Sequence, residues 1–100
     1  MNRSIAFGWI NVDISRSPES DRAHIRCFAR HLGYRLVWPR ELSVLPVVDQ
    51  VRNASADLVI LPAPDHLSAV ELNAVMDVAD VETVFPRLSF ARWAFQRPAP

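Results

Sequence analysis

Polar side chains that could do chemistry lie at two places in the sequence, each directly after an apolar run. A serine hydroxyl can act as a nucleophile, and two carboxylates can together bind a divalent cation. The alternative is structural, because Asp residues also turn loops and cap helices. The first place carries Asn11, Asp13, Ser15 and Arg16, and the second carries Asp65, His66 and Ser68.

These two places are expected to meet, because the chain alternates apolar strands with amphipathic helices, a pattern typical of a mostly parallel sheet. The pattern predicts a three-layer α/β domain with four strands in the order 2-1-3-4, a flavodoxin-like arrangement. In such a sheet a site lies beyond the carboxyl ends of strands 1 and 3. The predicted strands cover residues 5–12, 34–38, 57–61 and 81–85; helices are expected from 18, over 43–54 and after 68; residues 88–95 fit a strand or a short helix.

Local signals indicate where helices begin and end. Ser17 stands before a Pro, which is typical of a helix start, and Gly33 follows the apolar stripe, which is typical of a helix end. Ser68 and Glu71 have the spacing of a capping box. Gly8, inside the first strand, indicates a close approach by another group.

The composition fits one small domain and limits its partners. The chain has 100 residues, of which 50% are apolar, and its formal net charge is zero. Zero net charge excludes a strong overall attraction to nucleic acid or to an anionic membrane. We expect a single domain over residues 1–95, followed by a loose tail over residues 96–100.

The single cysteine and the lack of long apolar runs indicate the cellular compartment of the protein. Cys27 has no partner for an internal disulfide, and beside Phe28 it is expected to be a small buried hydrophobe. No apolar run approaches the ~20 residues that a membrane span needs. We therefore expect a cytoplasmic protein with no membrane contact, no cofactor and no metal.

Two segments resemble motifs of the serine recombinases, the resolvase/invertase family. Residues 7–13 (FGWINVD) resemble the family's opening strand, which reads roughly G-Y-x-R-V-S. Residues 57–67 (DLVILPAPDHL) are similar to its third strand and following loop, where a D-x-hydrophobic-hydrophobic run leads into L-D-R-L-x-R. Residues 25–33 fit its first helix, which ends in Gly. The resemblance spans about residues 5–85 and implies a resolvase-like form of the same fold.

The sequence departs from this family where the family has its chemistry. There a Ser attacks a DNA phosphodiester and nearby Arg residues bind the phosphate. By the resemblance, Asp13 stands at the position of the nucleophile and Asp65 is retained, while Asn11, His66 and Ala69 stand at positions of the arginines. A carboxylate repels phosphate, and the lost arginines would have stabilised the transferring group. The resemblance therefore implies a vestigial, non-catalytic site at Asn11, Asp13, Ser15, Asp65 and His66.

Two further groups of residues are candidates for binding surfaces. Arg22, Arg26 and Arg30 recur at helical spacing and form either a contact for phosphates or an acidic partner, or a solvated helix face. The aromatic C-terminal segment fits a protein interface, a site for single-stranded nucleic acid, or an edge element that folds back on the sheet. Its candidate interface residues are Phe90, Arg92, Trp93 and Phe95.

These observations favour a non-catalytic recombinase-like module that acts through protein contacts, with itself or with another protein. One alternative is a DNA-associated protein that retains weak nucleic-acid binding from a recombinase ancestor. Another is a small site for a divalent cation or ligand at Asp13 and Asp65, where strands 1 and 3 meet.

Overall fold

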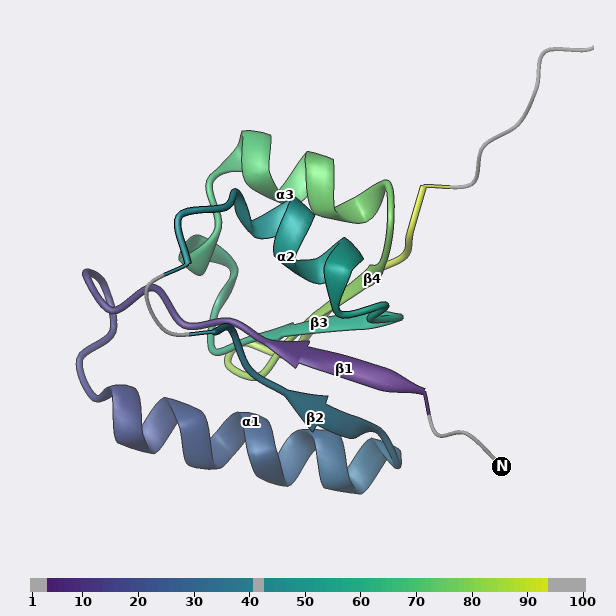
Figure 1. Cartoon of the computed structure of the whole chain (residues 1–100). Coiled ribbons are helices and arrows are strands. Elements are labelled where there is room, and N and C mark those ends of the chain that lie inside the picture. The colour runs from purple at the N-terminus through teal and green to yellow at the C-terminus, as the bar shows by residue number, and fades with distance from the viewer. Residues whose placement is uncertain (1–3, 41–42, 94–100) are drawn as a thin grey trace, which may run out of the picture.

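The computed structural model describes residues 4–40 and 43–93 of the chain, which form one α/β unit (Figure 1). A single five-stranded sheet has the order β2-β1-β3-β4-β5. The strands are β1 (Ile5–Gly8), β2 (Arg35–Val37), β3 (Leu58–Leu61), β4 (Asp80–Thr83) and β5 (Leu88–Phe90). The helices are α1 (Pro18–Leu32), α2 (Val47–Asn53) and α3 (Ala69–Met76), with a short 3-10 turn, η1 (Pro64–His66), after β3.

The predicted fold class, a mostly parallel α/β sheet, is confirmed, but the predicted count of four strands is wrong. The first four strands are parallel, and β5 pairs antiparallel with β4, with Val81 opposite Phe90 and Thr83 opposite Leu88. The chain after β4 turns back through Pro86 and adds a three-residue edge strand. Such a short strand gives no alternating pattern, so the sequence left residues 88–95 open between strand and helix.

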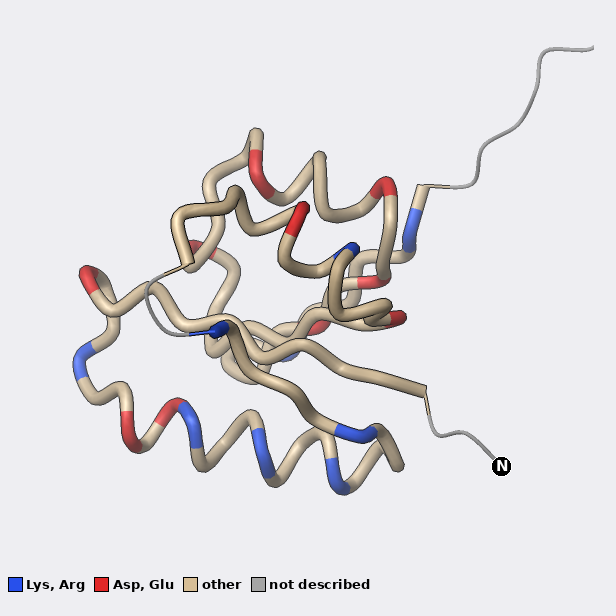
Figure 2. The backbone as a smooth tube through the Cα atoms, viewed as in Figure 1, with Lys and Arg blue, Asp and Glu red and all other residues tan. Residues whose placement is uncertain are grey.

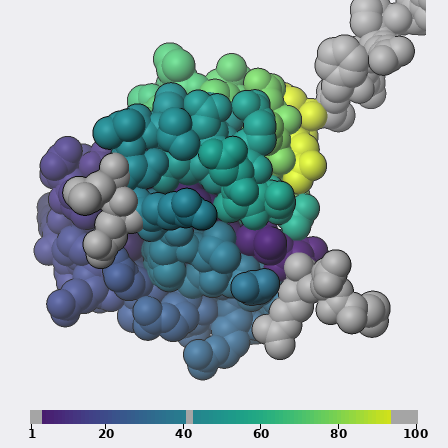
Figure 3. All heavy atoms as spheres, viewed as in Figure 1, coloured from purple at the N-terminus to yellow at the C-terminus, as the bar shows by residue number. Residues whose placement is uncertain are grey.

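The core lies in two layers, one on each face of the sheet. α1 covers one face and packs on a small cluster that includes Ala6, Ile25 and Ile60. α2 and α3 cover the other face, over a larger cluster that includes Val51, Val59 and Val75. β3 lies in the middle of the sheet and is buried along its whole length, because helices lie over both of its faces. The space-filling view shows the atoms of α2 and α3 on one side of the molecule and those of α1 on the other (Figure 3).

The predicted start and end of α1 and the predicted start of α3 are confirmed. The Ser20 amide donates to Ser17 Oγ at 3.4 Å, and Gly33 closes α1 with a left-handed φ of 80°. Ser68 and Glu71 form the expected capping box of α3. No helix in the described part of the chain is both long and apolar enough to cross a bilayer.

Three local predictions need correction. The first strand ends at Gly8 rather than at residue 12, because the chain turns at Asn11. α2 begins at Val47 rather than near residue 43, because the residue before Pro46 is biased away from helical backbone. Cys27 is exposed, since it lies on α1 outside the stripe that faces the sheet.

The predicted close approach at Gly8 is confirmed, and its partner is Trp38, in the segment directly after β2. A Cβ placed on Gly8 would lie 2.5 Å from Cζ3 of the Trp38 ring. Glycine therefore allows the indole to pack directly on the β1 backbone, at the end of the sheet where the strands terminate.

Candidate functional site

The loops after β1 and β3 meet at the carboxyl end of the sheet, and a buried histidine joins them. The Asn11 amide donates to Nδ1 of His66 at 2.9 Å. The indole N–H of Trp9 donates to the carbonyl oxygen of His66 at 3.3 Å. The structure thus brings together two of the predicted site residues, Asn11 and His66, through backbone and ring atoms.

The hydrogen bond fixes the chemical state of His66. Burial lowers the pKa of His66 below its ordinary value, and the nearby carboxylates of Asp65 and Asp21 oppose that shift. Nδ1 accepts the Asn11 amide proton, so the neutral ring carries its own proton on Nε2. Nδ1 is therefore unavailable as a general base.

The loop after β1 is held by its own polar groups. The Asn11 side-chain oxygen accepts from the Asp13 amide at 3.0 Å, and the Asn11 carbonyl accepts from the amides of Ile14 and Ser15. Ser15 Oγ donates to Oδ2 of Asp21 at 2.5 Å. The hydroxyl proton points to a carboxylate and not to the imidazole, so this loop holds no nucleophile paired with a histidine base.

Asp21 is the site residue that sequence reasoning missed. It belongs to α1, six residues after Ser15, and no motif links the two positions. A carboxylate in the first turn of a helix is favourable without any partner, so the pattern alone gave no reason to assign it a role.

The proposed carboxylate pair lies at the surface. Asp13 and Asp65 are both exposed, and each lies in one of the two joined loops. Within the described ranges, no group of three or more His, Cys, Asp or Glu side chains could hold a metal ion.

The three arginines of the stripe on α1 are exposed, and one of them, Arg22, contacts an aromatic ring. Arg22, Arg26 and Arg30 all face solvent. The Arg22 guanidinium lies 5.2 Å from the centroid of the Trp38 ring, a cation–π contact. The other two arginines remain available to a partner; in residues 4–40 and 43–93 the one ion pair is Arg52 with Asp49, at 3.4 Å.

The stripe belongs to a larger separation of charge. Residues 22–40 contain five arginines and no acidic residue, and residues 57–82 contain six acidic residues and no arginine. The first segment forms most of α1 and all of β2, at one end of the sheet, and the second runs from β3 to β4, toward the other end. Figure 2 shows red at the first turn of α1, blue along the rest of α1 and on β2, and red on α3 and β4. Counting charges along the sequence would have found this separation.

The C-terminal segment folds back on the domain. Phe90 packs against the larger core cluster, and the Arg92 amide donates to Asp80 Oδ1 at 2.7 Å. The Trp93 amide donates to the Met76 carbonyl, and its indole N–H donates to Asn73 Oδ1 at 3.1 Å, while 53% of Trp93 stays exposed. Among the candidate interface residues that the structure describes, Trp93 alone offers a large exposed ring; Phe95 and the tail 96–100 lie outside the described residues.

No protein-family model matches this chain, and no curated protein or solved structure is significantly similar to it. The resemblance to serine recombinases therefore stays a prediction from the residues that carry it.

Proposed function

We propose that this chain is a non-catalytic interaction module whose oppositely charged sides bind copies of itself head to tail. The observation that carries the proposal is the separation of five arginines from six acidic residues in a chain with zero net charge. A zero net charge removes overall repulsion between copies, and the separated charges supply an attraction that depends on orientation.

The sheet topology supports the head-to-tail arrangement. β2 and β5 are the end strands of the sheet, and no described strand pairs with their outer edges. Contact between two β2 edges would bring Arg35 of one copy toward Arg35 of the other, and contact between two acidic sides would bring α3 and β4 of one copy toward those of the other. Contact of the basic side, formed by α1 and β2, with the acidic side, formed by α3 and β4, brings opposite charges together, which is a heterologous interface that adds further copies.

The loops at the carboxyl end of the sheet support the non-catalytic part of the proposal. The groups that would do chemistry there, Ser15 Oγ and His66 Nδ1, are engaged in hydrogen bonds that hold the loops. A recombinase-like domain that lost its nucleophile would keep this scaffold and act through its surface.

Paired charge reversals test the proposal. Arg26→Glu with Arg30→Glu makes the basic side acidic, and Asp77→Lys with Glu82→Lys makes the acidic side basic. Light scattering after size exclusion at low salt should find each double variant smaller than the unmodified protein. An equimolar mixture should recover the large species, because each reversed side then meets its complement. If the mixture forms the large species, the loss of size in each double variant comes from its charges and not from misfolding. A mixture that stays small contradicts the proposal.

The exposed arginine stripe also favours a second candidate, contact with nucleic-acid phosphates. Anisotropy of a labelled DNA duplex at low salt should then rise with the unmodified protein and not with the Arg26→Glu, Arg30→Glu variant. The Asp77→Lys, Glu82→Lys variant separates the two functions, since it should lose self-association and keep or strengthen DNA binding. No change in anisotropy with the unmodified protein would remove this candidate.

A further inference from the structure

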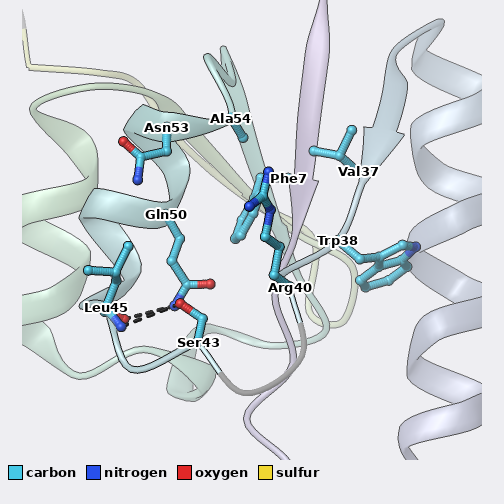
Figure 4. A pocket seen from close by; sticks show the side chains of 9 residues that line it. All are labelled: Phe7, Val37, Trp38, Arg40, Ser43, Leu45, Gln50, Asn53 and Ala54. Atoms are coloured by element: carbon cyan, nitrogen blue, oxygen red, sulfur yellow. Dashed lines mark hydrogen bonds between the residues drawn. The ribbon is translucent and has the colours of Figure 1, made fainter.

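The segment after β2 and the helix α2 enclose a hollow that the proposed self-association does not use. Its volume is about 640 Å³, within the range of small-ligand sites. On the strand side the wall is apolar and includes Phe7 and Val37, while Ser43, Leu45 and Gln50 lie on the side of α2 and the loop before it; the Trp38 ring points away toward α1 (Figure 4).

An acceptor in this hollow lacks a donor. Gln50 donates from Nε2 to the Leu45 carbonyl at 2.8 Å. Its Oε1 atom is buried and, among the described residues, has no hydrogen-bond partner. A buried carbonyl oxygen that accepts no hydrogen bond destabilises the site, so a ligand that donates a hydrogen bond there is favoured.

The charge of the hollow points to an anion. Arg40 extends between α2 and the strands, and no described acidic residue pairs with it (Figure 4). A second hollow of about 380 Å³ shares Trp38 and Arg40 and adds Arg22. The described residues that line the two hollows include two arginines and no Asp or Glu. Such a site disfavours cations and favours a carboxylate or phosphate.

We infer that this hollow binds the free carboxyl terminus of a peptide that ends in an apolar residue. One such residue supplies three matching groups: a carboxylate for Arg40, an amide N–H for Gln50 Oε1, and a side chain for the apolar wall. Ser43 Oγ accepts from the Leu45 amide at 3.4 Å and, in the described part of the chain, donates to no acceptor, so its proton is available to the same carboxylate. The Trp38 ring contacts Gly8 and Arg22 on the α1 side of the sheet, so it offers this hollow no free platform for stacking a nucleobase.

Fluorescence anisotropy with labelled pentapeptides tests the inference. The probes end in Val-Leu, Val-Val or Val-Phe, each made with a free carboxylate and as the carboxamide. We expect at least one carboxylate peptide to bind with a Kd on the order of 100 μM, and its carboxamide to bind about tenfold more weakly. A version methylated on the last amide nitrogen should also bind more weakly, because it has no proton for Gln50.

Three variants locate the binding. Arg40→Gln should weaken binding of the carboxylate peptide about tenfold and leave the carboxamide unchanged. Gln50→Met should weaken the parent peptide severalfold and leave the N-methylated peptide unchanged. Arg35→Gln, on β2 outside the hollow, is the matched control and should bind like the unmodified protein. Circular dichroism of each variant establishes that it is folded.

Either of two results overturns the inference. One is equal binding of carboxylate and carboxamide, and the other is no binding of any carboxylate peptide at about 1 mM. The charge-reversed variants that abolish self-association keep Arg40 and Gln50, so they should still bind peptide. Failure of the two proposals is therefore distinguishable.

Discussion

Two regions at the same end of the sheet use their polar groups in opposite ways. Where the loops after β1 and β3 meet, His66, Asn11 and Ser15 bond to groups of the chain itself. In the hollow beside α2, Gln50 Oε1 lacks a donor within the described chain, and Arg40 has no described acidic neighbour. The difference teaches that residue types typical of catalysis can serve structure alone, while less conspicuous residues keep their binding capacity.

The comparison predicts its largest effect at the buried histidine. His66→Ala should lower the free energy of unfolding by about 3 kcal/mol, because it leaves a cavity and removes the acceptor of the Asn11 amide. Urea denaturation followed by circular dichroism measures this loss. His66→Asn, whose side-chain oxygen can replace Nδ1, is the control and should lose less than half as much. Equal losses would mean that the hydrogen bond contributes little.

A smaller effect is expected at Gly8, the glycine on which the Trp38 ring packs. Gly8→Ala should lower the free energy of unfolding by about 2 kcal/mol, since the new methyl group meets Trp38 at 2.5 Å. Gly33→Ala is the matched control. An alanine there is strained by the backbone φ of 80°, but its Cβ would meet no other atom within 4 Å. Both should destabilise the fold, and Gly8→Ala alone should shift the Trp fluorescence. A shift of the same size in Gly33→Ala would contradict this assignment.

The pKa of His66 predicts how stability depends on pH. Burial lowers this pKa below the ordinary value of 6.5. The unfolded chain therefore takes up the proton at a higher pH than the folded one, so stability falls as pH drops below 6.5 and is fully present above it. Denaturant midpoints from pH 8 to pH 5 should fall more steeply for the unmodified protein than for His66→Asn. Parallel curves would show that the imidazole titrates alike in both states.

The smallest effect on stability is expected at Gln50, in the hollow beside α2. Gln50→Met removes an unsatisfied acceptor together with the bond to Leu45, and these opposite effects should leave the free energy of unfolding within about 0.5 kcal/mol of the unmodified value. Thermal and urea unfolding measure it. A loss well above that would mean that Gln50 holds the loop before α2, as His66 holds the loops at the neighbouring strands.

Much of the framework could be predicted from local sequence. The apolar run of β3, the capping box at Ser68 and the glycine that ends α1 all depend on nearby residues. They predict the parallel sheet, and with it the meeting of the loops after β1 and β3. A property that follows from neighbouring residues can be read without the structure.

The contacts of the candidate site could not be predicted from the sequence, because they depend on the tertiary structure. The bond from Ser15 to Asp21 and the burial of His66 depend on how the loops pack, and residue types do not specify that packing. β5 was left undecided between strand and helix because three residues are too few to show a period of two. The hollow is formed by side chains from β1, the segment after β2 and α2, and no local motif joins them.

The central claim, that this chain works by binding copies of itself through opposite charges, has one direct test. Light scattering coupled to size exclusion measures the mass of the unmodified protein over a concentration series, at about 20 mM and about 500 mM NaCl, which shortens the screening length from about 20 Å to about 4 Å. We predict a mass at low salt that grows with concentration beyond a dimer, and a monomer at high salt. A monomer at every concentration and both salts would contradict the claim.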